Sequence, residues 1–128
     1  MTWDPQAQLT TSLGMDQKDL EGIDKCLLEE VSIANASHPI RENLELIPAG
    51  EELSEVERLA EGGSSRGMKL RNALKNNIEK YDYVLIDCPP SSGLLVVNAI
   101  FATQKVLIPM TGDYLALQGL SHLMATLK

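Results

Sequence analysis

The residue with the clearest chemical potential is Asp87, a single carboxylate between an apolar run and two prolines. The run, residues 83–86 (YVLI), is typical of a strand buried on both faces of a parallel sheet. Pro89 and Pro90 cannot donate to a strand ladder, so the strand is expected to end at about Cys88. Asp87 then lies at the carboxyl end of a central strand, where open α/β sheets bind ligands. It could hold Mg²⁺ there or cap the next loop, and the strand alone does not decide between them.

The composition limits the classes of protein to consider. The chain has 128 residues, 44% hydrophobic and 4% aromatic, enough for one domain with a mostly aliphatic core. The formal net charge of −7 argues against an electrostatic DNA binder. No apolar run approaches the ~20 residues of a membrane helix, and the amino terminus lacks a signal-peptide pattern. Cys26 and Cys88 have no metal or redox spacing, which suits a reducing cytosol.

The apolar patterns on either side of Asp87 predict alternating helices and strands. Short strands ended by proline are expected at residues 44–48 and 105–109, and Ser37-His38-Pro39 is expected to be a loop. Helices are expected over residues 16–33, 54–60, 70–78 and 94–102 and from residue 114 onwards, with a capping box formed by Ser54 and Glu57. This alternation predicts a doubly wound parallel α/β sheet in a single domain, residues 1–128, without a linker.

One stretch has the opening spacing of a phosphate-binding P-loop but lacks its chemistry. Gly62 and Gly67 are separated by four residues, as in G-x-x-x-x-G-K-[ST]. Met68 follows Gly67 where the lysine belongs, and Lys69 comes one place late. The stretch also follows a predicted helix instead of a strand. We therefore interpret it as a helix–helix connection and identify no nucleotide-binding residue in the chain.

Three motifs in order resemble the ParA/MinD-type partitioning ATPases, including the ParA and Soj proteins. Residues 4–14 (DPQAQLTTSLG) resemble the segment after the family's second strand. Residues 81–94 (YDYVLIDCPPSSGL) resemble the Walker B segment. Residues 106–109 (VLIP) and 114–120 (YLALQGL) resemble the strand and helix that follow it. The resemblance covers essentially the whole chain and implies the P-loop NTPase fold with a deviant Walker A motif.

The resemblance assigns roles to two carboxylates. Asp87 would hold Mg²⁺ through its water shell. Asp4 would be the catalytic residue, lying in the switch region beside the γ-phosphate and orienting the attacking water or coupling hydrolysis to conformation. Without the resemblance, Asp4 is an ordinary turn residue before proline. The family's cofactors are Mg²⁺ and ATP, its partners are a second copy, a ParB-like stimulating protein and DNA but no membrane, and its location is the cytoplasm, on the nucleoid.

The chain also departs from the family pattern. The family's first strand, its KGGVGKT-type P-loop and its first helix are not in this sequence, and Thr2 replaces a usual acid. The family's later strands, with its base-recognition and DNA-contacting regions, are not in the sequence either. We therefore expect a central fragment with a partial sheet that does not hold ATP by itself, because phosphates are bound mainly by P-loop amides and lysine.

The missing first strand has a structural consequence. In the family it lies between the Asp87 strand and the 106–109 strand. Its absence leaves unpaired edges, so we expect a re-paired sheet, strand exchange between chains or a marginally stable fragment. Two functions remain: the middle segment of a partitioning ATPase, or a non-catalytic interaction module that keeps the family's dimer or partner surface.

Overall fold

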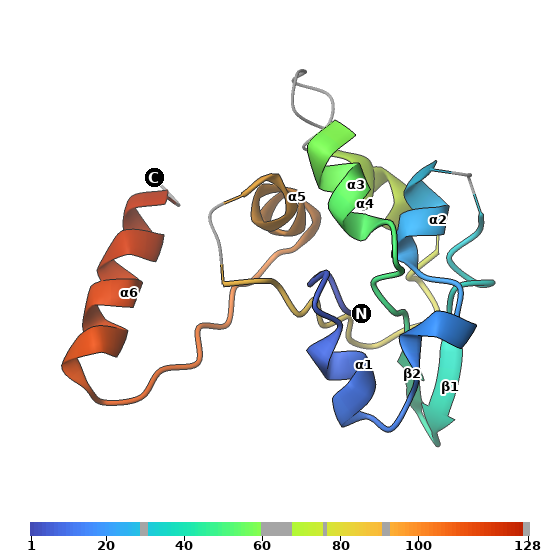
Figure 1. Ribbon diagram of the computed structural model, residues 1–128, viewed down its shortest axis with the longest axis horizontal. Helices are drawn as coiled ribbons and strands as arrows, with labels where there is room; N and C mark the ends of the chain where they lie inside the picture. The colour runs from blue at the N-terminus through green and yellow to red at the C-terminus, as the bar shows by residue number, and fades with distance from the viewer. Residues whose placement is uncertain (29–30, 60–67, 76, 91–92, 127–128) are drawn as a thin grey trace.

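The computed structural model describes residues 1–28, 31–59, 68–75, 77–90 and 93–126 (Figure 1). Its helices are α1 (Gln8–Ser12), the 3₁₀ helix η1 (Gln17–Asp19), α2 (Ile23–Leu28), α3 (Leu53–Leu59), α4 (Lys69–Leu74), α5 (Leu94–Ala102) and α6 (Tyr114–Thr126). Its strands are β1 (His38–Arg41) and β2 (Leu44–Leu46). The predicted Gly62–Gly67 connection lies outside the described residues.

The strands β1 and β2 form an antiparallel hairpin. Asn43, with a φ of 58°, lies in its turn, a left-handed conformation that asparagine tolerates better than most residues. The prediction of a loop at Ser37-His38-Pro39 was wrong, because Pro39 pairs with Glu45. Proline is accepted in β1 because, among the described residues, the strand pairs only with β2 and is therefore an edge strand.

A short parallel arrangement joins three segments that are far apart in the sequence. The Trp3 amide donates to the Asp87 carbonyl (2.8 Å), and the Asp87 amide donates to the Met1 carbonyl (3.0 Å). On the other side, the Thr2 amide donates to the Ile47 carbonyl (2.9 Å). Residues 1–3 therefore lie between the end of β2 and the 85–87 segment.

The predicted doubly wound sheet is only partly formed. In the described residues, the sheet consists of the β1–β2 hairpin and one parallel bridge between Thr2 and Asp87. The prediction of a strand buried on both faces was wrong, because the side chains of Tyr83 and Leu85 are 88% and 76% exposed. Residues 105–109 form no strand either. A β-strand requires a hydrogen-bonded neighbour, and these segments have too few.

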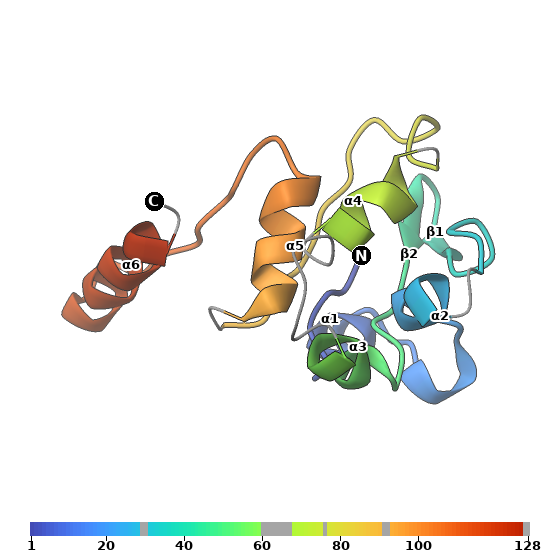
Figure 2. The same cartoon turned by 90° about the horizontal axis from the view of Figure 1, so that it is seen from above.

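The core lies between the helices and the 1–3 segment. Its buried side chains pack in one cluster that includes Trp3, Ile23, Ile33, Leu53, Val56, Leu70, Leu74 and Leu95. Helices α4 and α5 lie side by side in both views (Figures 1 and 2). Buried Asn98 joins them, because its side-chain oxygen accepts the Leu70 amide (3.4 Å) while its amide group donates to the Leu94 carbonyl (3.0 Å). We call the described part of residues 1–102 the packed body.

The predicted helix over residues 16–33 is shorter than its pattern suggested. Among the described residues of this range, helix forms only in η1 and α2, and α2 begins directly after Gly22. A Cβ atom at Gly22 would lie 2.4 Å from the Gly50 amide nitrogen, so the two backbones touch. The Ile23 and Asp24 amides donate to the Pro48 and Ala49 carbonyls at 2.9 and 3.2 Å. These contacts fix where the helix starts. Helix α5, in contrast, has the predicted bounds.

Residues 103–126 form a carboxy-terminal arm that extends to one side of the packed body (Figures 1 and 2). Helix α6 and residues 108–111 line an open groove of about 450 Å³, with Ile108, Leu120 and Leu123 among its side chains. The side chains of Leu107 and Leu115 are 87% and 75% exposed. Among the described helices, none has the length and apolar character needed to cross a membrane.

Candidate functional site

Asp87 lies where the 85–87 segment meets residues 1–3. Both its amide and its carbonyl are bonded to the 1–3 segment, so its backbone position is fixed. Its side chain is exposed, on the same face as Tyr83 and Leu85, while Val84, Ile86 and Cys88 are half-buried on the other face. This alternation is that of a strand with one open face. The Asp87 carboxylate is therefore available to a ligand.

Asp4 follows the 1–3 segment directly and begins a tight turn. Its Oδ1 accepts the Gln6 amide (2.9 Å), and its carbonyl accepts the Ala7 amide (3.0 Å). Ala7 has a φ of 53°, a left-handed conformation that is unfavourable for alanine and is held by this turn. The Asp4 side chain is half-exposed. The turn orients one carboxylate oxygen and leaves the other for a water or a ligand.

Trp3 connects these two acids, and sequence reasoning did not identify it. Its backbone amide is bonded to Asp87, its neighbour is Asp4, and its indole Nε1 donates to the Leu95 carbonyl in the first turn of α5 (2.6 Å). The ring is 1% exposed. The chain has a single tryptophan, and its position directly before Asp4 was the available signal. Trp3 holds the two acids and α5 in one arrangement.

Cys88 follows Asp87 directly and is half-buried. Burial raises the pKa of the Cys88 thiol, and the negative charges of Asp87 and Asp4 raise that pKa further. The thiol is therefore held in its protonated form and is a poor nucleophile. A site with two carboxylates and a neutral thiol attracts a cation.

The two carboxylates suit Mg²⁺ better than a metal whose ligands must all come from protein side chains. Mg²⁺ is usually held by one or two carboxylates together with waters and substrate phosphates. In the part of the chain that the structure describes, no cluster of three or more His, Cys, Asp or Glu side chains could hold a metal. The sequence contains no G-x-x-x-x-G-K-[ST] motif, so these residues do not form a phosphate cradle of that type.

A second loop at the end of β2 is fixed by a buried carboxylate. Asp24 is 1% exposed, and its two oxygens accept the amides of Lys25 (2.8 Å) and Glu52 (2.9 Å). Gly50, with a φ of 84°, lies so close that a Cβ atom there would overlap the Asp24 carboxylate. Sequence reasoning placed Asp24 only within a helix and did not predict this contact.

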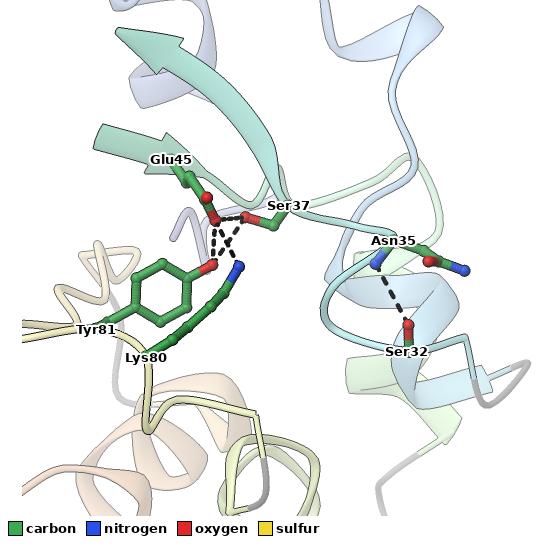
Figure 3. Close-up of polar contacts among 6 residues, drawn as sticks. All are labelled: Ser32, Asn35, Ser37, Glu45, Lys80 and Tyr81. Carbon is green, nitrogen blue, oxygen red and sulfur yellow. Dashed lines mark hydrogen bonds and ion pairs between the residues drawn. The ribbon is translucent and has the colours of Figure 1, made fainter. Parts of the chain in front are cut away.

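A polar cluster around Glu45 joins β2 to the residues just before the 83–87 segment, at the end of that segment away from Asp87 (Figure 3). Glu45 accepts hydrogen bonds from the Ser37 hydroxyl (2.6 Å) and the Tyr81 hydroxyl, and forms an ion pair with Lys80 (3.3 Å). The hydrogen bonds from Ser37 and then Tyr81, with Lys80, lower the pKa of Glu45 to about 2. Nearby, the Asn35 amide donates to the Ser32 hydroxyl (3.4 Å). The cluster joins the hairpin to the beginning of the 83–87 segment.

Comparisons with known proteins identify the family of the chain. A family model described as an AAA domain (AAA_31) matches residues 1–128. The sporulation initiation inhibitor protein Soj of Bacillus subtilis is 38% identical over 127 residues, covering 98% of this chain and 50% of Soj. The chain belongs to the ParA/Soj family of AAA-domain ATPases. The chromosome partitioning protein ParA of Myxococcus xanthus is 40% identical over 126 residues, covering 97% of this chain and 44% of that protein.

Solved structures of similar proteins have the same fold. A cobyrinic acid a,c-diamide synthase from Mycobacterium smegmatis, with bound ATP analogue and magnesium, is 33% identical with a TM-score of 0.88. The match covers 98% of this chain and 52% of that one. A putative plasmid partition protein from Borrelia burgdorferi, bound to AMPPNP, is 27% identical with a TM-score of 0.82, covering 98% and 54%. The ParA-like P-loop ATPase fold predicted from the sequence is therefore supported, and the chain spans about half the length of these relatives.

Proposed function

We propose that this chain is the central part of a ParA/Soj-type partitioning ATPase. In this proposal Asp87 would hold Mg²⁺, and Asp4 would orient the attacking water beside the γ-phosphate or couple hydrolysis to conformation. The observation that carries the proposal is the bonding of the Asp87 backbone to Trp3, which brings Asp4 and Asp87 to the same end of adjacent segments. The family match over residues 1–128 supports it, as does the M. smegmatis relative with bound ATP analogue and magnesium.

The phosphate cradle belongs to another part of the parent protein in this proposal. Phosphates need several convergent amides and a lysine, and the two acids at this site repel them. The 128 residues alone are therefore not competent to bind ATP. The parent protein dimerises on ATP in the cytoplasm, binds DNA non-specifically and releases it after hydrolysis stimulated by a ParB-like partner, with chromosome or plasmid segregation as the outcome.

The test is to graft residues 1–128 into B. subtilis Soj in place of the matching residues, and to measure Mg²⁺-dependent ATP hydrolysis. The graft is expected to hydrolyse ATP, because the Soj segments supply the phosphate cradle. Asp4→Ala and Asp87→Ala are each expected to lower kcat by about 100-fold or more, a typical contribution of a group that positions a proton or charge in the transition state.

Asp82→Ala is the matched control. Asp82 is an exposed acid of the same segment but lies at its other end, away from Asp4. This variant is expected to keep the activity of the graft. Normal hydrolysis in Asp87→Ala, or loss of hydrolysis in Asp82→Ala to the same degree, would contradict the assigned roles.

A second function, a non-catalytic interaction module, is favoured by the exposed side chains of Tyr83 and Leu85 and by those of the arm. In that case the two acids have no catalytic task. A graft that is folded by circular dichroism, elutes as a single species and hydrolyses no ATP would support the module over the ATPase.

A further inference from the structure

Helix α4 has an exposed face whose charged side chains are all positive. Lys69, Arg71 and the C-cap residue Lys75 are exposed on this face, whereas Leu70 and Leu74 of the same helix are buried in the core. Arg71 and Lys75 are four residues apart, so their side chains are neighbours on the helix surface. We call Lys69, Arg71 and Lys75 the α4 basic face.

In the part of the chain that the structure describes, no acidic side chain neutralises the α4 basic face. None of its three cations forms an ion pair or a side-chain hydrogen bond there. Residues 68–78 and 88–112 contain no aspartate or glutamate, so neither α4 nor α5, which packs against it, supplies a counter-charge. Helix α2 also packs against α4, but its Asp24 is buried and bonded to backbone amides. The positive charge is therefore available to an anionic ligand.

The chemistry of this face suits phosphates better than an acidic peptide. Asn72 is exposed beside the three cations, so every exposed side chain in the described part of α4 and its C-cap is a hydrogen-bond donor. Lysine, arginine and asparagine side chains are common donors to the phosphate oxygens of DNA. A docked peptide is held mainly by apolar anchors in well-packed pockets, and none of these exposed side chains is apolar.

We propose that the α4 basic face contacts the phosphate backbone of DNA. The inference rests on the proposed function, in which the parent protein binds DNA, and it assigns a contact surface to this chain. The net charge of −7 repels DNA as a whole, so the contact is local, weak and strongly dependent on salt. Three neutralised phosphates give a slope of log K against log salt of about −3, a loss of affinity of about 40-fold between about 50 and about 200 mM salt.

The test is fluorescence anisotropy of a labelled DNA duplex of random sequence, titrated with the 128-residue chain at several salt concentrations. Binding with a salt slope of about −3 is expected. Arg71→Gln combined with Lys75→Gln is expected to reduce the slope to about −1, because two phosphate contacts are lost. Lys18→Gln combined with Arg41→Gln is the matched control. It removes two exposed cations outside α4, changes the net charge equally and is expected to keep the slope.

The other outcomes decide between DNA, a protein partner and no ligand. Absence of salt-dependent binding at about 50 mM salt would overturn the proposal, and so would an equal change of slope in the control variant. Equal affinity for a polyglutamate peptide of matched charge would also overturn it and indicate an acidic protein partner. Normal ATP hydrolysis by the Soj graft, without DNA binding by the chain, would refute the α4 contact and leave the ATPase proposal intact. An inactive graft, with DNA binding that weakens only in the α4 variant, would refute the ATPase proposal alone.

Discussion

The packed body and the carboxy-terminal arm have similarly apolar sequences and different structures. In the body, the apolar side chains of α5, including Leu95 and Ala99, are buried against α4 and Trp3. In the arm, Leu107, Tyr114 and Leu115 remain largely exposed. The difference lies in the neighbours, because a helix satisfies its own backbone and needs one packing partner, whereas a strand also needs hydrogen-bonded neighbours. The body has these contacts within the described residues and the arm does not.

The largest difference between the two regions is expected from leucine truncation. Leu53→Ala removes a side chain that is 0% exposed and is expected to lower the free energy of unfolding by about 2–5 kcal/mol. Leu115→Ala in the arm is expected to change it by less than about 0.5 kcal/mol. Urea denaturation followed by circular dichroism measures both. Equal losses would show that the arm packs as tightly as the body in solution.

Two glycines with similar positive φ angles, Gly50 and Gly14, allow the steric cost of an added Cβ atom to be separated from the cost of the backbone conformation. Gly50→Ala is expected to destabilise the chain by about 1–3 kcal/mol more than Gly14→Ala, because its Cβ overlaps the Asp24 carboxylate. Gly14 has nearly the same positive φ, 81°, with open space around it, so its substitution reports the strain alone. Thermal unfolding of the two variants measures the difference. Identical losses would mean that the Asp24 loop gives way without cost.

A smaller effect is expected at the anchor between the site and the core. Trp3→Phe keeps an aromatic ring but removes both the hydrogen bond to the Leu95 carbonyl and part of the buried ring volume. We expect the free energy of unfolding to fall by about 0.5–2 kcal/mol, with protection from hydrogen exchange decreasing at residues 85–87 and in the first turn of α5. Unchanged exchange at residues 85–87 would show that Trp3 does not hold the Asp87 segment.

The smallest effect concerns the exposed Glu45 cluster and depends on pH. The pKa of Glu45 is lowered to about 2 in the folded chain, so its carboxylate stabilises the fold above the ordinary glutamate pKa and loses that contribution as the pH falls toward 2. Glu45→Gln is expected to lower Tm modestly at neutral pH, with a difference from the unsubstituted chain that shrinks below about pH 4. A difference that stays constant with pH would show that the ionised form is not favoured by Ser37, Tyr81 and Lys80.

The sequence predicted best those features that depend on nearby residues. Helix α5 was predicted with its observed bounds because its apolar run follows Gly93 and needs no distant partner to be helical. The turn at Asp4 followed from the proline beside it. Pro89 and Pro90 correctly marked the end of the segment that contains Asp87, but that segment is not the buried strand that was predicted. Features that depend on distant contacts were missed. Helix α2 starts late because the Gly22 backbone lies against that of Gly50. Trp3 is an anchor because its indole bonds to the Leu95 carbonyl, a contact between residues 92 positions apart that the sequence does not reveal.

The failures in the sheet have the same physical origin. Residues 83–88 and 105–109 have strand composition, yet neither forms a regular strand in the described chain. Strand propensity reflects packing on a pleated surface with neighbours on both sides, and the pattern alone cannot show whether those neighbours are present. The short sequence motifs nevertheless identified the family, because a motif depends on residues that are adjacent in the sequence and not on the neighbouring strands of the sheet.

The central claim, that this chain carries the metal carboxylates of an ATPase but not its phosphate cradle, is tested most directly by isothermal titration calorimetry with Mg²⁺-ATP. The 128-residue chain is expected to give no saturable heat at sub-millimolar nucleotide, whereas the Soj graft is expected to bind and to lose that binding with Asp87→Ala. Saturable binding by the 128-residue chain itself, abolished by Asp87→Ala, would contradict the claim and show that these residues hold phosphates by a group not identified at this site.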